Sequence, residues 1–126
     1  MDYTVIISSY AALLALYYIY LSVNVIKIRK AEGMSLGNGS NTALERATRA
    51  HGNFIEYVPI SLILVFLLEY QGLASHYVHA LGGLLFISRV VHGSAIINNN
   101  LKARGLSMMS TFAIVIISAV LLLLSR

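Results

Sequence analysis

Three long stretches of the chain carry no Asp, Glu, Lys or Arg, namely residues 3–26, 70–88 and 105–125. A helix needs about 20 mostly apolar residues to cross the hydrocarbon core of a bilayer, so each stretch can hold a spanning helix. A fourth apolar segment, residues 57–68, must extend toward the N-terminus to be long enough. The pattern therefore predicts an all-α, integral membrane four-helix bundle, one domain over residues 1–126. Its spans are expected at about residues 3–26, 45–68, 75–97 and 107–124.

Local signals predict where these helices begin, turn and pack. Thr42 is followed three residues later by Glu45, the spacing of a capping box, so Thr42 is expected to be the N-cap of the second helix. Residues 69–72, Glu-Tyr-Gln-Gly, predict a tight turn. Pro59 predicts a kink in the second helix. The pair 82–83, Gly-Gly, predicts that a neighbouring helix approaches the third span closely.

The composition excludes an ordinary water-exposed surface. The 126 residues are 58% hydrophobic and 11% charged, whereas soluble domains average about 25% charged residues. The sequence contains no cysteine, which excludes disulfides, thiolate metal sites and a cysteine nucleophile. The net charge of +4 is explained by the cytoplasmic Lys/Arg excess of membrane proteins, so no nucleic-acid partner is expected.

Lysine and arginine concentrate in the segments that follow the first and third spans. These residues are Lys27, Arg29, Lys30, Arg46, Lys102 and Arg104. The turn between the second and third spans has none, and the termini contribute only Arg126. The positive-inside rule therefore puts both long loops in the cytoplasm and both termini outside it.

Five polar residues lie inside or at the edge of the predicted spans, where ionisable groups are costly and mark functional sites. Arg49, Asn53 and Glu56 stand at i, i+4 and i+7 on one face of the second helix. Arg89 and His92 stand at i and i+3 on the third, near the same cytoplasmic end. Together they suit a zwitterionic ligand with carboxylates and an ammonium, because arginine binds a carboxylate in a bidentate fork.

The same five polar residues also fit a purely structural role in helix packing. Glu56 and Arg89 can neutralise each other between helices, with Asn53 and His92 as interhelical hydrogen-bonding groups. Periodicity alone does not separate this interpretation from a ligand site.

The remaining histidines are expected at interfaces. His51 lies beside Arg49 but on another face, where a headgroup or loop contact is predicted. His76 and His79 have i, i+3 spacing near the outer interface, but no carboxylate or third histidine is placed to complete a metal site. No metal is therefore expected.

Residues 44–59, LERATRAHGNFIEYVP, resemble the signature segment of the MAPEG family, the membrane-associated proteins in eicosanoid and glutathione metabolism. Residues 36–39, Leu-Gly-Asn-Gly, are similar to a loop of its bacterial members, and residues 89–92, Arg-Val-Val-His, to the Arg-x-x-His of its third span. The resemblance covers essentially the whole chain. It indicates a bacterial-type member in an inner membrane.

The resemblance implies a bundle that assembles as a homotrimer and holds glutathione between subunits at the cytoplasmic end. Arg49, Asn53 and Glu56 match the family's glutathione-binding positions on the second helix, and His92 matches one on the third. With Arg89, these residues form the predicted glutathione-binding set.

Catalysis needs the thiolate of glutathione, so a cation or hydroxyl donor must lie near the sulfur. Arg104 and Ser107 loosely represent the family's catalytic Arg-Ser pair and are the predicted catalytic residues. A hydrophobic cleft between the first and fourth spans is expected to hold a lipophilic small molecule that arrives through the membrane lipid. Gly52 and Ile96 replace an arginine and a tyrosine of the prostaglandin-synthesising member, so prostaglandin synthesis is not expected.

The leading hypothesis is a glutathione transferase or peroxidase acting on lipophilic electrophiles. The alternative is a non-catalytic ligand-binding or scaffold protein of the same fold. A four-span drug/proton exporter is disfavoured, because it needs a carboxylate in the middle of its first span and residues 3–26 contain none.

Overall fold

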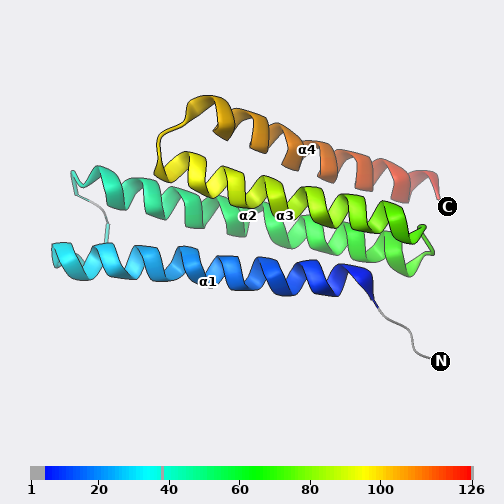
Figure 1. Ribbon diagram of the computed structural model, residues 1–126, viewed down its shortest axis with the longest axis horizontal. Helices are drawn as coiled ribbons and strands as arrows, with labels where there is room; N and C mark the ends of the chain where they lie inside the picture. The colour runs from blue at the N-terminus through cyan, green and yellow to red at the C-terminus, as the bar shows by residue number, and fades with distance from the viewer. Residues whose placement is uncertain (1–4, 38, 126) are drawn as a thin grey trace.

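The computed structural model describes residues 5–37 and 39–125 and consists of four helices, α1 (Ile6–Glu32), α2 (Thr42–Tyr70), α3 (Ser75–Ile97) and α4 (Leu101–Leu124) (Figure 1). All four are long and apolar enough to cross a membrane, by length and composition. The described segments contain no strand. The predicted all-α membrane four-helix bundle is confirmed.

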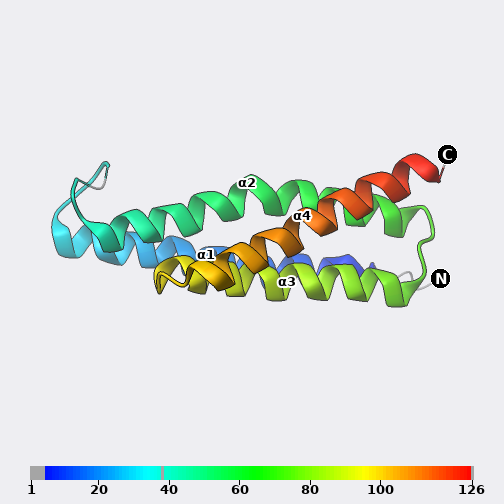
Figure 2. The same ribbon diagram turned by 90° about the horizontal axis from the view of Figure 1, so that it is seen from above.

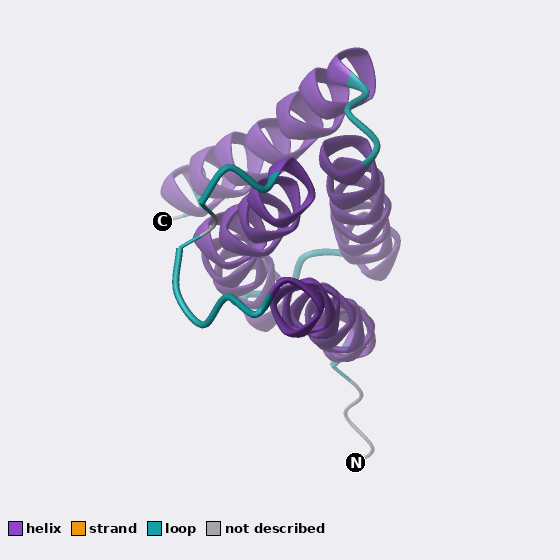
Figure 3. Ribbon diagram, turned by 90° about the vertical axis from the view of Figure 1, so that its left-hand side faces the viewer, coloured by secondary structure: helices purple, strands orange, loops and turns teal. Residues whose placement is uncertain are grey.

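Helices α2 and α3 form the centre of the bundle. Both α1 and α4 pack against this pair, and α4 crosses it obliquely (Figure 2). Within the described residues α1 and α4 make no contact with each other, and the end-on view shows them on opposite sides of the bundle (Figure 3). The cleft expected between the first and fourth spans is therefore not formed within one chain.

Asparagine side chains determine where α2 and α4 begin. The Asn41 side-chain oxygen accepts a hydrogen bond of 2.8 Å from the Leu44 amide, so Asn41 is the N-cap of α2. The prediction of Thr42 as the N-cap is wrong by one residue. Asn100 accepts from the Ala103 amide at 3.1 Å, and α4 therefore begins at Leu101 rather than at the predicted 107. Each cap satisfies one of the amides that a helix start leaves without an intrahelical acceptor.

Helix α1 is longer than the predicted first span. It continues past Lys27 to Glu32 and ends at Gly33, whose φ of 65° is left-handed. Lysine and arginine are good helix formers, so the charges that end the apolar run do not end the helix. Pro59 lies within α2, which the structure assigns as one helix from Thr42 to Tyr70.

The glycine pair in α3 is a point of close contact with α1. A β-carbon on Gly82 would lie 2.5 Å from Cδ2 of Tyr10, whereas one on Gly83 would meet Cε1 of the same ring at 3.9 Å. The predicted close approach is therefore confirmed, and Gly82 is the residue that makes it possible.

Glu69 belongs to the last turn of α2 rather than to the predicted tight turn, which Gln71 and Gly72 form. Its side chain is 7% exposed and accepts hydrogen bonds from the backbone amides of Ile6 at 2.5 Å and Ile7 at 2.9 Å. The carboxylate thus supplies acceptors and a favourable charge to the N-terminus of α1. This contact between residues far apart in sequence ties α1 to α2 at the end opposite the polar residues of α2.

Candidate functional site

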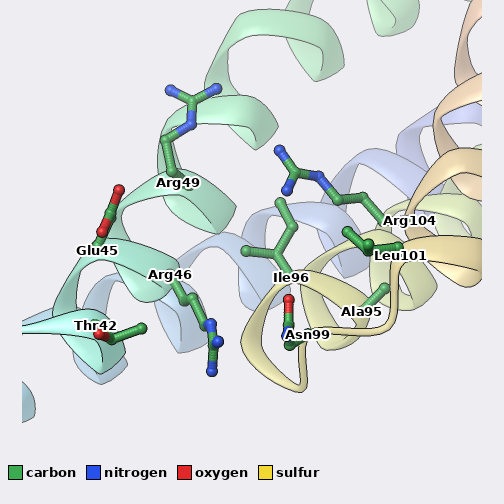
Figure 4. Close-up of a pocket in the computed structure, with 9 residues that line it drawn as sticks. All are labelled: Thr42, Glu45, Arg46, Arg49, Ala95, Ile96, Asn99, Leu101 and Arg104. Atoms are coloured by element: carbon green, nitrogen blue, oxygen red, sulfur yellow. The ribbon is translucent and has the colours of Figure 1, made fainter.

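A polar stripe on α2 faces the ends of α3 and α4. Its residues follow helical spacing and are Thr42, Glu45, Arg46, Arg49, Asn53 and Glu56. Spacings of three and four residues return to the same face of a helix, which brings these side chains into one row. The short turn between α3 and α4 then places the end of α3 and the start of α4 opposite this row (Figure 4).

The first of two adjoining cavities, here called the arginine cavity, has a volume of about 260 Å³. Its lining residues are Thr42, Glu45, Arg46, Arg49, Ala95, Ile96, Asn99, Leu101 and Arg104. Figure 4 shows guanidinium groups from both α2 and α4 around it, with Arg104 extending from α4 toward α2. Three arginines and one glutamate make the cavity cationic, which favours an anionic occupant.

The second cavity, here called the donor pocket, has a volume of about 310 Å³. It is lined by Asn53, His92, Leu101, Arg104, Gly105 and Met108. Leu101 and Arg104 line both cavities, so the two spaces adjoin along α4. The donor pocket thus combines polar side chains from three helices with an apolar methionine.

Arg89 lies behind the wall of the donor pocket and is only 1% exposed. Its Nη2 donates a hydrogen bond of 2.6 Å to the side-chain oxygen of Asn53 and lies 3.4 Å from Nδ1 of His92. The guanidinium carbon is 5.9 Å from the centre of the Phe54 ring, within cation–π range. Nε and Nη1 have no hydrogen-bond partner among the described residues. Arg89 is therefore a buried cation that holds two pocket residues in place.

The contacts of Arg89 decide which atoms face the pocket. Arginine is only a donor, so the oxygen of Asn53 is occupied and its amide N–H groups remain for a ligand. Nδ1 of His92 must be an acceptor in the contact with Arg89, which leaves the proton of the neutral ring on Nε2. Asn53 and His92 thus offer hydrogen-bond donors beside the Arg104 guanidinium.

Arg49 and Glu56 form an ion pair with each other. Nη1 of Arg49 lies 3.9 Å from Oε1 of Glu56, and both side chains are 52% exposed. The interhelical neutralisation of Glu56 by Arg89 is not formed, because the Asn53 amide takes the place of a carboxylate beside Arg89. Both residues belong to α2, so within one chain this pair joins no two helices.

Only one of the two predicted catalytic residues lines the cavities. Arg104 lines both cavities. Ser107 is buried outside both linings, and its hydroxyl is within hydrogen-bond distance of two backbone oxygens of its own helix, Ala103 at 2.8 Å and Arg104 at 3.0 Å. A hydroxyl has one proton to donate, and here it is directed into the helix.

The sequence matches the family model described as MAPEG family over residues 7–124. The chain belongs to the MAPEG family. Two curated relatives are both called "Inner membrane protein YecN", one from Escherichia coli strain K12 and one from Escherichia coli O6:H1. Each is 35% identical over 83 residues, which cover 66% of this chain. The match covers 63% of each relative, just under two thirds of its length. No solved structure matches the chain.

In this MAPEG chain, His51 has a different role from the predicted headgroup or loop contact. Its Nε2 lies 3.0 Å from the Ser22 hydroxyl, and its ring stacks on Tyr18 with centroids 4.8 Å apart. His51 thus joins α2 to α1.

The outer histidines lie apart from the two cavities. Nδ1 of His79 lies 2.8 Å from the Tyr10 hydroxyl. No group of three or more metal-ligating side chains occurs in the described segments.

The sequence interpretation missed several residues of this MAPEG site. Arg46 stands three residues before Arg49 on the same face of α2, so helical spacing was a signal that could have found it. Asn99 and Met108 reach the cavities from the α3–α4 turn and from α4. Nothing in the local pattern relates these two positions to α2, because only the packing of the helices brings them there.

Proposed function

We propose that this MAPEG protein binds glutathione in the two cavities and conjugates it to lipophilic electrophiles. The observation that carries the proposal is the hydrogen bond from Arg89 to Asn53, which occupies the Asn53 oxygen and leaves its amide N–H groups as donors in a pocket that Arg104 also lines. A pocket of donors and one guanidinium suits a sulfur anion. The thiolate, not the thiol, is the nucleophile in such reactions.

The donor pocket is the proposed position of the sulfur. Arg104 supplies a positive charge, and Asn53 and His92 supply N–H groups that stabilise the thiolate relative to the thiol. The thiol proton passes to water. The sulfur then forms a bond to an electrophilic carbon of the second substrate, and the leaving group departs with the bonding electrons.

The arginine cavity and its rim are the proposed position of the charged groups of glutathione. Arg49 can bind a carboxylate in a fork geometry. Glu56, the ion-pair partner of Arg49, is available to the ammonium of the same ligand residue. The exposed positions of both side chains leave them free to exchange their mutual contact for ligand contacts.

A homotrimer is part of the proposal. In one chain Arg49 and Glu56 are half exposed on a helix long enough to span a membrane, and charges facing lipid are costly. A second copy placed against this face would cover them. Mass measurement in mild detergent tests this, and a monomer alone would contradict it.

We further propose a multi-pass protein of a bacterial inner membrane, with both termini outside the cytoplasm. The four apolar helices and the name of the two relatives support the location. The Lys/Arg excess of the α1–α2 and α3–α4 segments supports the orientation. A C-terminal reporter that is active only in the cytoplasm should stay silent.

Conjugation of chlorodinitrobenzene to glutathione by the purified protein is the direct test of catalysis. Activity is expected from the wild type and strongly reduced activity from Arg104→Gln. Lys102→Gln is the matched control, since it removes an exposed cation two residues away that lines neither cavity. Wild-type protein that binds glutathione but gives no conjugate would reject the transferase.

The position of Ser107 favours one second candidate, a ligand-binding protein without catalysis. Its hydroxyl is directed to backbone carbonyls, so it does not serve as a donor to a sulfur in this conformation. Arg104 is then the sole member of the predicted pair at the pocket. Binding without turnover, by calorimetry and by the conjugation assay together, would identify this candidate.

A further inference from the structure

A separate cavity, here called the basic cavity, lies at the C-terminal end of α1. It has a volume of about 350 Å³ and shares no lining residue with the arginine cavity or the donor pocket. Its lining residues are Ile26, Arg29, Lys30, Gly33, Met34 and Ser35. In Figure 1 this end of α1 lies at the same end of the bundle as the start of α2. The basic cavity is therefore where the apolar run of α1 gives way to charged residues.

Arg29 is held in place at the basic cavity by the segment that follows α1. Its Nη1 donates a hydrogen bond of 2.6 Å to the backbone oxygen of Gly37. The Arg29 backbone oxygen accepts in turn from the amide of Gly33 and, at 3.0 Å, from that of Met34. A guanidinium has five N–H donors, so most of them remain available after the contact with Gly37. Arg29 is thus a positioned donor group.

The basic cavity has cationic lining residues and no acidic one. Lys30 adds three N–H donors, and Ser35 adds a hydroxyl. Neither Arg29 nor Lys30 forms a salt bridge with a residue that the structure describes. The carboxylate nearest in sequence, that of Glu32, does not line the cavity. Such a site favours a phosphate group without a neighbouring ammonium, because arginine and lysine both bind phosphate.

An apolar stripe on α1 ends at these cations. Ile19, Val23 and Ile26 are exposed and follow the i, i+4, i+7 spacing of one helix face. Lys30 continues this face at i+11. The eleven residues from Ile19 to Lys30 extend about 16 Å at about 1.5 Å per residue, close to half of a hydrocarbon core of roughly 30 Å. The stripe therefore matches the depth of one leaflet, with cations at the level of the headgroups.

We propose that the basic cavity binds the phosphate of an anionic phospholipid whose acyl chain lies along the apolar stripe of α1. This inference does not depend on glutathione binding, because the two sites share no lining residue. Membrane topology and the helix dipole are two other roles of basic residues, and both depend on charge alone. Neither role requires a guanidinium fixed by the Gly37 carbonyl or a cavity wall formed by Ile26 and Met34.

The test measures the binding of phosphatidylglycerol and phosphatidylcholine to the full chain in an uncharged detergent, by native mass spectrometry. The wild type should bind phosphatidylglycerol about 10-fold or more tightly, because the choline cation would meet Arg29 and Lys30 without an acidic partner. Lys30→Gln should weaken the binding of phosphatidylglycerol about 5-fold or more. Lys27→Gln is the matched control, since it removes an exposed cation that does not line the cavity, and it should weaken binding far less.

Three results would overturn the proposal. Equal binding of both lipids by the wild type does so, even if Lys30→Gln fails to fold. Equal losses in Lys30→Gln and Lys27→Gln do so as well, because a diffuse positive charge would then be sufficient. Glycerol 1-phosphate, which has a phosphate but no acyl chain, should not displace phosphatidylglycerol at equal concentration. Displacement under this condition would identify a site for a free phosphate instead of a lipid.

Discussion

The buried guanidinium of Arg89 on α3 donates a hydrogen bond of 2.6 Å to the side-chain oxygen of Asn53 on α2. This contact joins the two central helices and leaves the amide N–H groups of Asn53, a lining residue of the donor pocket, without a competing acceptor role. A neutral amide, rather than a carboxylate, is thus the strongest partner of a fully buried cation. Packing and the proposed ligand site depend on the same pair.

Breaking this pair from one side should destabilise the protein. Asn53→Leu leaves the buried Arg89 cation without its short hydrogen bond, and the loss of a hydrogen bond to a charged group typically costs about 1.5–3 kcal/mol. The double variant Asn53→Leu with Arg89→Met removes the charge as well and should recover much of the melting temperature, but not glutathione binding. A double variant as unstable as Asn53→Leu alone would show that the pair does not hold the helices together.

The Arg49–Glu56 pair should behave in the opposite way. Because the pair lies on one helix and joins no two helices within the chain, Arg49→Ala and Glu56→Ala should each lower the melting temperature less than Asn53→Leu does. Arg49→Ala should nevertheless weaken glutathione binding by about 10-fold or more, as the loss of a charged hydrogen bond. Melting curves with and without glutathione measure both effects. An apo protein that unfolds when Arg49 is removed would make Arg49 part of the scaffold.

The contact of α1 with α3 predicts a difference between two adjacent glycines. Gly82→Ala forces a β-carbon against the Tyr10 ring and should cost about 1–3 kcal/mol, the usual effect of overpacking. Gly83→Ala is the matched control, since its β-carbon meets the same ring at ordinary contact distance. Comparable losses of melting temperature in the two variants would argue against this helix contact.

Glu69 should matter for stability and not for the ligand. Glu69→Ala removes the acceptor of the Ile6 and Ile7 amides and should lower the stability by about 0.5–2 kcal/mol, the range measured for helix caps. Glu69→Gln keeps an acceptor oxygen and should lose less. Glutathione affinity should be unchanged in both, because Glu69 lies at the other end of α2 from the cavities. A loss of affinity as large as that in Arg49→Ala would contradict this separation.

The sequence by itself determined the class of the fold and one side of the site. Only helices satisfy every backbone group of a single segment in lipid, so long apolar runs are sufficient to predict four spanning helices. The 3.6-residue period puts Arg49, Asn53 and Glu56 on one face of α2 whatever surrounds it. The signature around them was sufficient to indicate the MAPEG family, which the family match confirms.

The tertiary structure decided which side chains meet across helices. Arg89 pairs with Asn53 rather than Glu56, Glu69 caps α1, and Asn99 enters the arginine cavity. The packing of the helices also keeps α1 and α4 apart, on opposite sides of α2 and α3. Helical periodicity states which residues share a face, but not toward which neighbour the face is rotated. Rotation and crossing are set by close contacts such as Gly82 against Tyr10, which appear only when the helices are packed together.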